Sequence, residues 1–227
     1  MSSPSEIQGE PLHGRGAPNA EILRASPRLF DNPVLDKLSR VHWSMPLILY
    51  TPVVAVLVWL SLRSLSPLTV FLTAALGYGI WTLIEYFGHR YLFHAEFPGE
   101  WGARIHFLIH GVHHDHPSDP LRLVMPPLLS VPIMLLALAI VWLLFGFPLG
   151  YAVLIGFIVG YVGYDMVHYY VHHATPTTRV GRYLRQVHMV HHFRNPDAYY
   201  GVSAPYWDAV FGTRHIPPAA SSETHHG

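Results

Sequence analysis

The sequence contains no cysteine among its 227 residues. Disulfide bonds, iron–sulfur clusters and thiolate-bound metals are therefore excluded, and any metal ion must be held by nitrogen and oxygen atoms. Charge is also scarce, because Asp, Glu, Lys and Arg make up 12% of the chain, against about 25% in soluble proteins. Fourteen basic residues balance fourteen acidic ones. With no basic face visible, we expect no nucleic-acid partner.

Long apolar runs take the place of the missing charge. Residues 123–164 contain no Asp, Glu, Lys or Arg, and they are long enough for two helices of the ~20 residues that cross a membrane. Two shorter uncharged runs precede them, and residues 146–150 offer a turn between the last two helices. We therefore predict an all-α integral membrane protein with four transmembrane helices, near residues 44–63, 66–88, 125–146 and 149–172, and a cytosolic cap of short helices.

The remaining segments complete a predicted division into three parts. Residues 1–30 are polar, carry scattered Pro, Gly and Ser, and show no cleavable signal peptide, so they are interpreted as a disordered leader. Residues 31–213 form the membrane domain and 214–227 a flexible tail. Within the domain, residues 32–41 predict either a short interfacial helix capped by Asp31 or Asn32, or a solvated linker. Gly156 and Gly160 predict close helix packing.

The distribution of basic residues predicts the orientation. Arg63 is the one basic residue in the two turns at 63–66 and 146–149, and the other 13 of the 14 Lys and Arg lie on the opposite side of a four-span topology. The positive-inside rule makes that side cytoplasmic. We expect a multi-pass protein of the inner membrane in a bacterium, or of the endoplasmic reticulum in a eukaryote, with its functional site on the cytoplasmic side.

Ten of the 18 histidines fall into four tight clusters beside the ends of the apolar runs. Neutral imidazole binds iron, zinc and copper, and ten imidazoles are too many for one ion. They suit two ions with about five ligands each, which leaves room for dioxygen or water. The predicted metal ligands are His89, His94, His110, His113, His114, His168, His172, His188, His191 and His192.

The spacing within the clusters supports convergence on one site. His110, His113 and His114 lie at i, i+3 and i+4 on one helix face, and the triplet at 188–192 repeats this pattern. His89 and His94 are about 140° apart around an ideal helix, so they can meet only if the helix ends or bends between them. Three neighbouring histidines break the spacing and predict hydrogen-bonding or surface roles: His106, His116 and His173.

Two carboxylates share a helix face with predicted ligands. Glu85 precedes His89 by four residues, and Asp165 precedes His168 by three. Ligating histidines usually donate their second N–H to a carboxylate or carbonyl, which fixes the orientation of the ring. Glu85 and Asp165 are therefore predicted to support the ligands from behind.

Beyond these patterns, the sequence resembles the integral-membrane fatty acid hydroxylase superfamily, over about residues 28–213. The resemblance is strongest to the fatty acid 2-hydroxylases that act on sphingolipid acyl chains. Three segments carry it: the histidine cluster at 89–94; the run at 113–127, which contains Asp119-Pro-Leu-Arg122-Leu-Val-Met-Pro126-Pro127; and Gly201-Val-Ser-Ala-Pro-Tyr-Trp207-Asp208-Ala-Val-Phe-Gly212-Thr213.

The resemblance implies a non-haem diiron centre on these ten histidines, with zinc able to occupy the same nitrogens in an isolated preparation. It implies that dioxygen and two electrons place a hydroxyl group on the carbon next to the carbonyl of an acyl chain. The resemblance also implies a membrane lipid as the substrate. His116-Pro-Ser-Asp119 lacks the glycines of a haem-binding turn, so we expect the electrons to come from a separate donor, such as a cytochrome b5 or a ferredoxin with its reductase.

Three other functions use similar residues. A sterol oxidase or desaturase and a carotenoid hydroxylase could use the same metals, and the run at 122–127 favours acyl substrates only by resemblance. A transition-metal transporter would place its ligands near the bilayer midplane, whereas the predicted span centres lack His, Asp and Glu.

Overall fold

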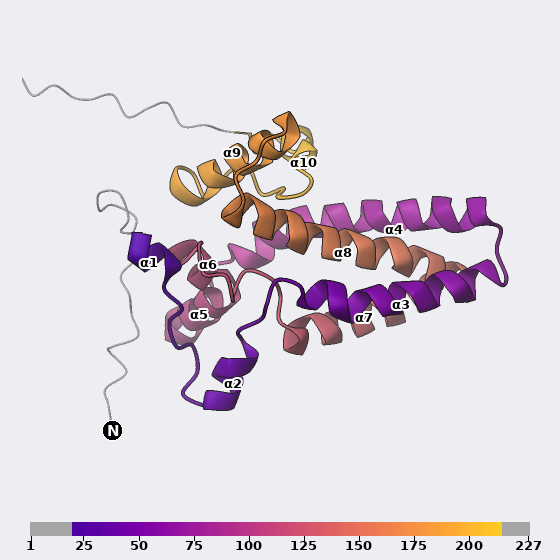
Figure 1. Ribbon diagram of the computed structural model, residues 1–227, viewed down its shortest axis with the longest axis horizontal. Coiled ribbons are helices and arrows are strands. Elements are labelled where there is room, and N and C mark those ends of the chain that lie inside the picture. The colour runs from indigo at the N-terminus through magenta and orange to yellow at the C-terminus, as the bar shows by residue number, and fades with distance from the viewer. Residues whose placement is uncertain (1–19, 215–227) are drawn as a thin grey trace, which may run out of the picture.

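The computed structural model describes residues 20–214, and in that range it contains helices and no β-strand. Four helices lie side by side (Figure 1) and are long and apolar enough to cross a membrane. They are α3 (Met45–Leu62), α4 (Pro67–Gly88), α7 (Pro127–Phe145) and α8 (Leu149–His173). The predicted all-α membrane fold with four spans is confirmed, and the helix bounds lie within a few residues of those expected.

The local sequence explains where these helices begin and end. Proline stands in the first turn of α3, α4 and α7, where its missing N–H would have no helical partner. The Ser66 side chain caps α4 by accepting a hydrogen bond from the backbone N–H of Thr69. Gly146 ends α7 with a φ of 64°, a conformation that glycine adopts at little cost.

Helix α8 is the centre of the bundle. It packs against α3, α4 and α7. In its apolar 18-residue stretch 67% is buried, whereas the corresponding stretches of the other three spans are 17–22% buried. At the contact with α4 the two backbones nearly touch. A Cβ on Gly156 would lie 1.7 Å from the carbonyl oxygen of Ala74, and one on Gly77 would lie 1.9 Å from that of Val153. The predicted role of Gly156 in close packing is therefore confirmed.

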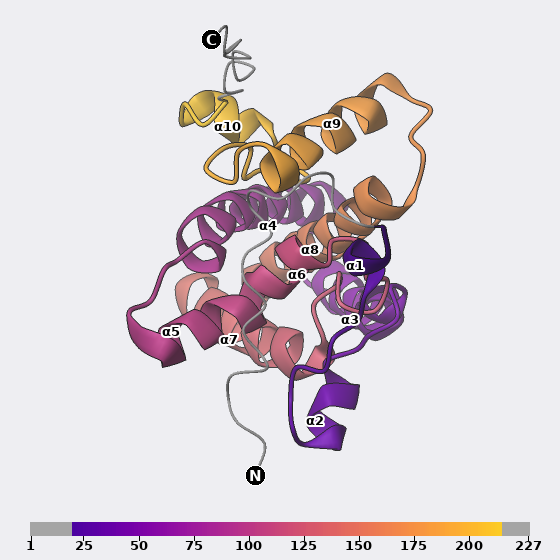
Figure 2. The same cartoon turned by 90° about the vertical axis from the view of Figure 1, so that its left-hand side faces the viewer.

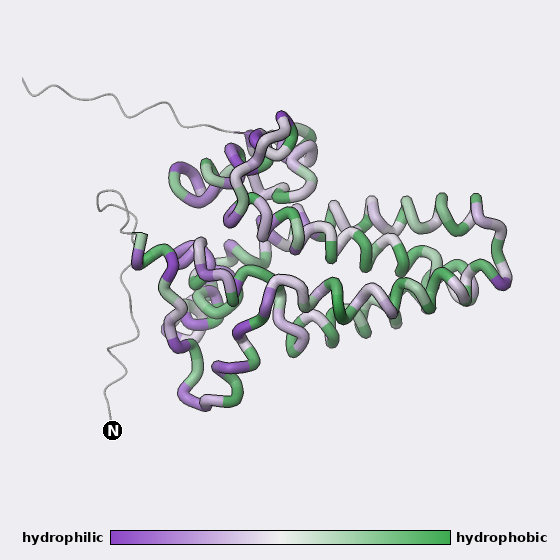
Figure 3. Tube along the Cα trace, in the orientation of Figure 1, coloured by the Kyte–Doolittle hydropathy of each residue, from purple (hydrophilic) through white to green (hydrophobic). Residues whose placement is uncertain are grey.

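The short helices gather at one end of the bundle (Figures 1 and 2), and Figure 3 shows polar residues concentrated there. Two π-helical segments carry the chain into or through this cap: η2 (His89–Phe93) follows α4, and η3 (Phe107–Gly111) follows α5. The cap helices are α1 (Ala20–Arg24), α2 (Pro33–Leu38), α5 (Gly99–His106), α6 (Val112–Asp115), α9 (Arg179–Phe193) and α10 (Tyr206–Val210).

Residues 20–41, which we call the N-terminal strap, lie along residues 116–122. The Ile22 carbonyl accepts a hydrogen bond from His116 Nδ1 (2.7 Å), and the Leu23 carbonyl accepts one from the backbone N–H of Ser118 (2.9 Å). Leu29 is buried. The predicted disorder is therefore wrong for residues 20–30, because their carbonyls and one apolar side chain are bound by residues distant in sequence. Residues 1–19 and 215–227 of the predicted leader and tail lie outside the described residues.

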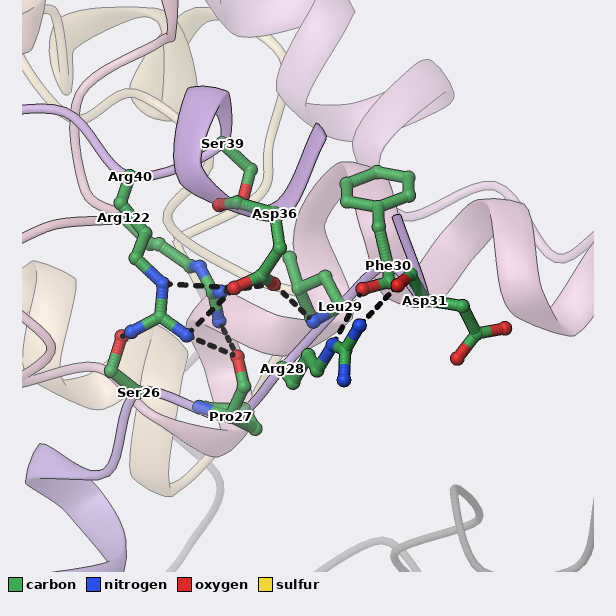
Figure 4. A network of polar contacts seen from close by, with 10 residues as sticks. All are labelled: Ser26, Pro27, Arg28, Leu29, Phe30, Asp31, Asp36, Ser39, Arg40 and Arg122. Carbon is green, nitrogen blue, oxygen red and sulfur yellow. Dashed lines mark hydrogen bonds and ion pairs between the residues drawn. The ribbon is translucent and has the colours of Figure 1, made fainter. Parts of the chain in front are cut away.

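Asp36 holds the strap together (Figure 4). Its carboxylate accepts hydrogen bonds from the Leu29 N–H (2.7 Å) and from the Arg40 and Arg122 guanidiniums (3.0 and 3.1 Å). The Leu29 bond and the two guanidiniums hold the pKa of Asp36 below its ordinary value. Arg122 also donates to the Pro27 carbonyl. The predicted helix at its centre is present as α2, capped by Asn32 with Pro33 in its first turn.

The glycine contact yields a prediction with an internal control. Gly156→Ala should destabilise the protein because α4 and α8 must separate to make room for the methyl group. The expected loss of unfolding free energy is about 1–3 kcal/mol, the usual cost of overpacking. Gly163→Ala, on the same helix, should be neutral or stabilising, since its Cβ would meet nothing within 4 Å. Thermal unfolding in detergent measures both, and equal melting temperatures would contradict the packing argument.

Candidate metal centre

The ten predicted histidines converge at the cap end of the bundle, where they form two groups of five. In each group the candidate ligand nitrogens all lie within 4.8 Å of one another, which is close enough to surround one metal ion. The first group contains His89, His94, His110, His114 and His191. The second group contains His113, His168, His172, His188 and His192.

Each histidine triplet contributes to both groups. In the segment formed by η3 and α6, His110 and His114 belong to the first group and His113 to the second. Helix α9 does the reverse, since His188 and His192 belong to the second group and His191 to the first. Neighbours at i and i+4 thus share a group, whereas the residue at i+3 belongs to the other. Both segments therefore contribute ligands to the two groups.

The π-helix η2 explains how His89 and His94 meet. A π-helix forms i→i+5 hydrogen bonds, and the His94 N–H donates to the His89 carbonyl over 3.3 Å. The widened turn brings the two rings together, with 3.3 Å between their Nε2 atoms. The five-residue spacing predicted that the helix ends or bends here, and the change from α-helix to π-helix provides the bend. His110 also lies in a π-helix, η3.

The ring nitrogens face one another at short range. In the first group His89 Nε2 lies 3.0 Å from His110 Nε2, and His94 Nε2 lies 3.1 Å from His191 Nε2. In the second, His172 and His188 bring their Nε2 atoms to 2.8 Å. Such packing is incompatible with several positive rings, so the imidazoles must be neutral, the form that binds metal.

Burial enforces this neutral form in the cap. Desolvation, reinforced by the nearby His106, lowers the pKa of His94 to about 4. Desolvation first and neighbouring histidines second lower the pKa well below its ordinary value at five further positions: His110, His113, His188, His191 and His192. At neutral pH each ring therefore offers a lone pair and carries one proton.

Two rings of the first group are fixed by backbone carbonyls. His89 Nδ1 donates to the Tyr200 carbonyl over 2.6 Å, and His191 Nδ1 donates to the Ala198 carbonyl over 2.7 Å. A carbonyl only accepts, so each proton lies on Nδ1 and each Nε2 lone pair points into the group. Sequence reasoning missed this role of residues 198–204, which we call the carbonyl loop, because a backbone acceptor leaves no side-chain signature.

The structure gives Glu85 a different contact from the one predicted. Its carboxylate accepts hydrogen bonds from Ser203, through the backbone N–H (2.7 Å) and the hydroxyl. His89 donates to Tyr200 instead. Glu85 therefore does not bond His89 directly, because the carbonyl loop lies between the carboxylate and the histidine groups. Its contact with the ligands passes through the backbone of that loop.

Asp165 is buried on α8, as its predicted supporting role requires, but no hydrogen bond joins it to His168. Within residues 20–214, Asp165 Oδ2 and His168 Nδ1 each lack a hydrogen-bond partner. The same is true of His188 Nδ1 and His192 Nδ1 in that range. Three rings of the second group thus have free Nδ1 atoms, in contrast to the carbonyl-bound rings of the first.

The three histidines that break the repeated spacing lie outside both groups. His116 bonds the strap at Ile22, and His173 stacks on Tyr169 with ring centroids 4.4 Å apart. His106 adjoins the first group closely enough to lower the pKa of His94. The non-ligand roles predicted for these residues agree with these positions.

Comparison with known proteins adds independent information. The family described as fatty acid hydroxylase matches residues 74–213. The Arabidopsis thaliana protein dihydroceramide fatty acyl 2-hydroxylase FAH2 is 39% identical over 189 residues, which cover 82% of this chain and 79% of the relative. Human fatty acid 2-hydroxylase is 33% identical over 210 residues, with 82% of this chain and 56% of the relative covered.

A solved structure shares the fold as well. The hydroxylase domain visible in full-length scs7p superposes with a TM-score of 0.77 at 36% identity, and the match covers 82% of this chain and 71% of that one. The family match spans more than half of the chain and includes all ten clustered histidines. This chain belongs to the fatty acid hydroxylase family.

Proposed function

We propose that the chain is a membrane-bound non-haem diiron oxygenase that hydroxylates a lipid acyl chain at carbon 2, in a fatty acid or in a sphingolipid such as ceramide. The observation that carries this proposal is the pair of five-histidine groups at the end of four apolar helices. The relatives named above are fatty acid or dihydroceramide 2-hydroxylases, which favours acyl chains over sterols and carotenoids.

The donor set fits iron. Each group offers five neutral imidazole nitrogens and no carboxylate, and the carbonyl loop already turns two of the lone pairs inward. One iron ion would be held by the first group and one by the second, and zinc suits the same nitrogens. When bound, the two ions would supply the activation of dioxygen that an acyl C–H bond requires, since no side chain can do so.

The chain itself would position the lipid and exclude water. His89 follows directly on α4, while His168 and His172 lie in the last turns of α8, so the histidine groups border the apolar spans. A lipid whose tail runs along the spans would place its polar end beside the cap. Seven of the ten rings are buried, three in the first group and four in the second, which limits solvent access.

The surroundings of the centre follow from charge and chemistry. The Lys and Arg distribution supports a cytoplasmic cap, in the bacterial inner membrane or the endoplasmic reticulum. Hydroxylation with dioxygen consumes two electrons, which a separate cytochrome b5- or ferredoxin-type donor would supply. We also propose that Asp165 supports the second group, because its buried Oδ2 and the Nδ1 of His168 both lack a partner among residues 20–214.

The function is tested by mass spectrometry of lipids from a host that lacks 2-hydroxy acyl chains. Expression of the chain should yield lipids with one added oxygen, placed on carbon 2 by fragmentation and labelled when the dioxygen is isotopic. His188→Ala should abolish the product, whereas His106→Ala, outside both groups, should retain it. Oxygen found only on sterols or carotenoids would overturn the proposal.

The division of the ligands is tested on α9, where two ligands three residues apart belong to different groups. His188→Ala should remove metal from the second group and His191→Ala from the first, so each lowers bound metal from about two ions per chain to about one. The double variant should bind neither. Elemental analysis of the purified protein measures this, with His106→Ala as the control. Loss of both ions in each single variant would contradict separate groups.

A further inference from the structure

The carbonyl loop is clamped by two buried carboxylates. Asp208, at the start of α10, accepts hydrogen bonds from the backbone N–H groups of Tyr200 (2.8 Å) and Gly201 (2.9 Å) and from the Thr213 hydroxyl (2.6 Å). Glu85, on α4, accepts hydrogen bonds from Ser203 in the same loop. Asp208 is completely buried, and its three donors satisfy an otherwise costly carboxylate.

The clamp contacts a stretch of the loop with an unusual backbone conformation. Tyr199 has a φ of 59°, a left-handed conformation that is unusual for a tyrosine. Its N–H donates to the Thr213 carbonyl over 3.1 Å. Gly201 packs so closely that an added Cβ would lie 2.4 Å from the Ala204 carbonyl oxygen and 2.9 Å from Asp208 Oδ2. The backbone at 199–201 is thus held by contacts with Asp208 and Thr213.

The two carbonyls that this loop presents serve one group only. Tyr200 and Ala198 accept from His89 and His191, both of the first group. In the second group, the Nδ1 atoms of His168, His188 and His192 have no partner among residues 20–214. A change in the loop should therefore act unequally on the two groups.

We propose that Asp208 is a positioning residue for the first histidine group, acting through the carbonyl loop on His89 and His191, and that it leaves the second group unaffected. This rests on the proposed function to the extent that the two groups bind metal ions. Glu85 acts in the same way through Ser203. Partners that orient ligating histidines typically change metal affinity by about 10- to 100-fold.

The test is a mutant cycle that uses zinc as a redox-inert probe. The protein is purified in detergent and loaded with zinc, and the zinc that stays bound is measured as a chelator is added. Asp208→Asn keeps the volume of the side chain, but its amide NH₂ must face a backbone N–H. In the His188→Ala background, where only the first group can bind zinc, Asp208→Asn should lower the zinc affinity of that group by about 10- to 100-fold. In the His191→Ala background, where only the second group can bind zinc, Asp208→Asn should leave the zinc affinity of that group unchanged to within about twofold. Asp197→Asn, an exposed carboxylate beside the loop, is the control.

The melting temperature shows whether Asp208→Asn folds. If it does not, Glu85→Gln is the second variant, and it should likewise lower zinc affinity in the first group only. Equal losses from both groups, or no loss from either, would overturn the inference. Wild-type protein that retains no zinc would overturn it together with the metal-binding proposal. Wild-type protein that binds two ions but makes no 2-hydroxy lipid would refute the function alone, because the cycle does not depend on turnover.

Discussion

The structure depends on keeping ten neutral imidazoles in nitrogen-to-nitrogen contact inside a protein. Rings whose Nε2 atoms lie 2.8–3.3 Å apart cannot all carry a positive charge, and lone pairs that face one another repel unless a cation lies between them. Burial lowers the pKa of His94 to about 4 and so enforces the neutral state. The close packing of α4 on α8 and the change to π-helix at His89 both bring rings to this centre.

Sequence periodicity predicted much of this arrangement for a physical reason. An uncharged run long enough to cross a membrane has few alternatives to a helix, and triplets at i, i+3 and i+4 share a helix face. The same periodicity could not assign rings to groups, because His110 and His113 lie on one face and yet serve different groups. That division depends on which neighbouring helix each ring meets, and the spacing of residues along one helix does not encode it.

Backbone acceptors account for what the sequence could not show. The supporting role predicted for Glu85 followed from its place four residues before His89, but the Tyr200 carbonyl accepts the His89 hydrogen bond and Glu85 binds Ser203. The side chains that hold these acceptors in place do appear in the sequence. Asp208 and Thr213, which bond the loop, lie in one of the segments that carry the family resemblance.

The run at 119–127 shows that a discriminating motif need not contact the substrate. Arg122 donates to Asp36 and to the Pro27 carbonyl, which ties the N-terminal strap to the cap. Its guanidinium is thus committed to holding two distant segments of the chain together, and a lipid would have to displace Asp36 to bind it. Because this is a structural role, this part of the family resemblance reflects how the N-terminal strap is held and says nothing directly about the lipid.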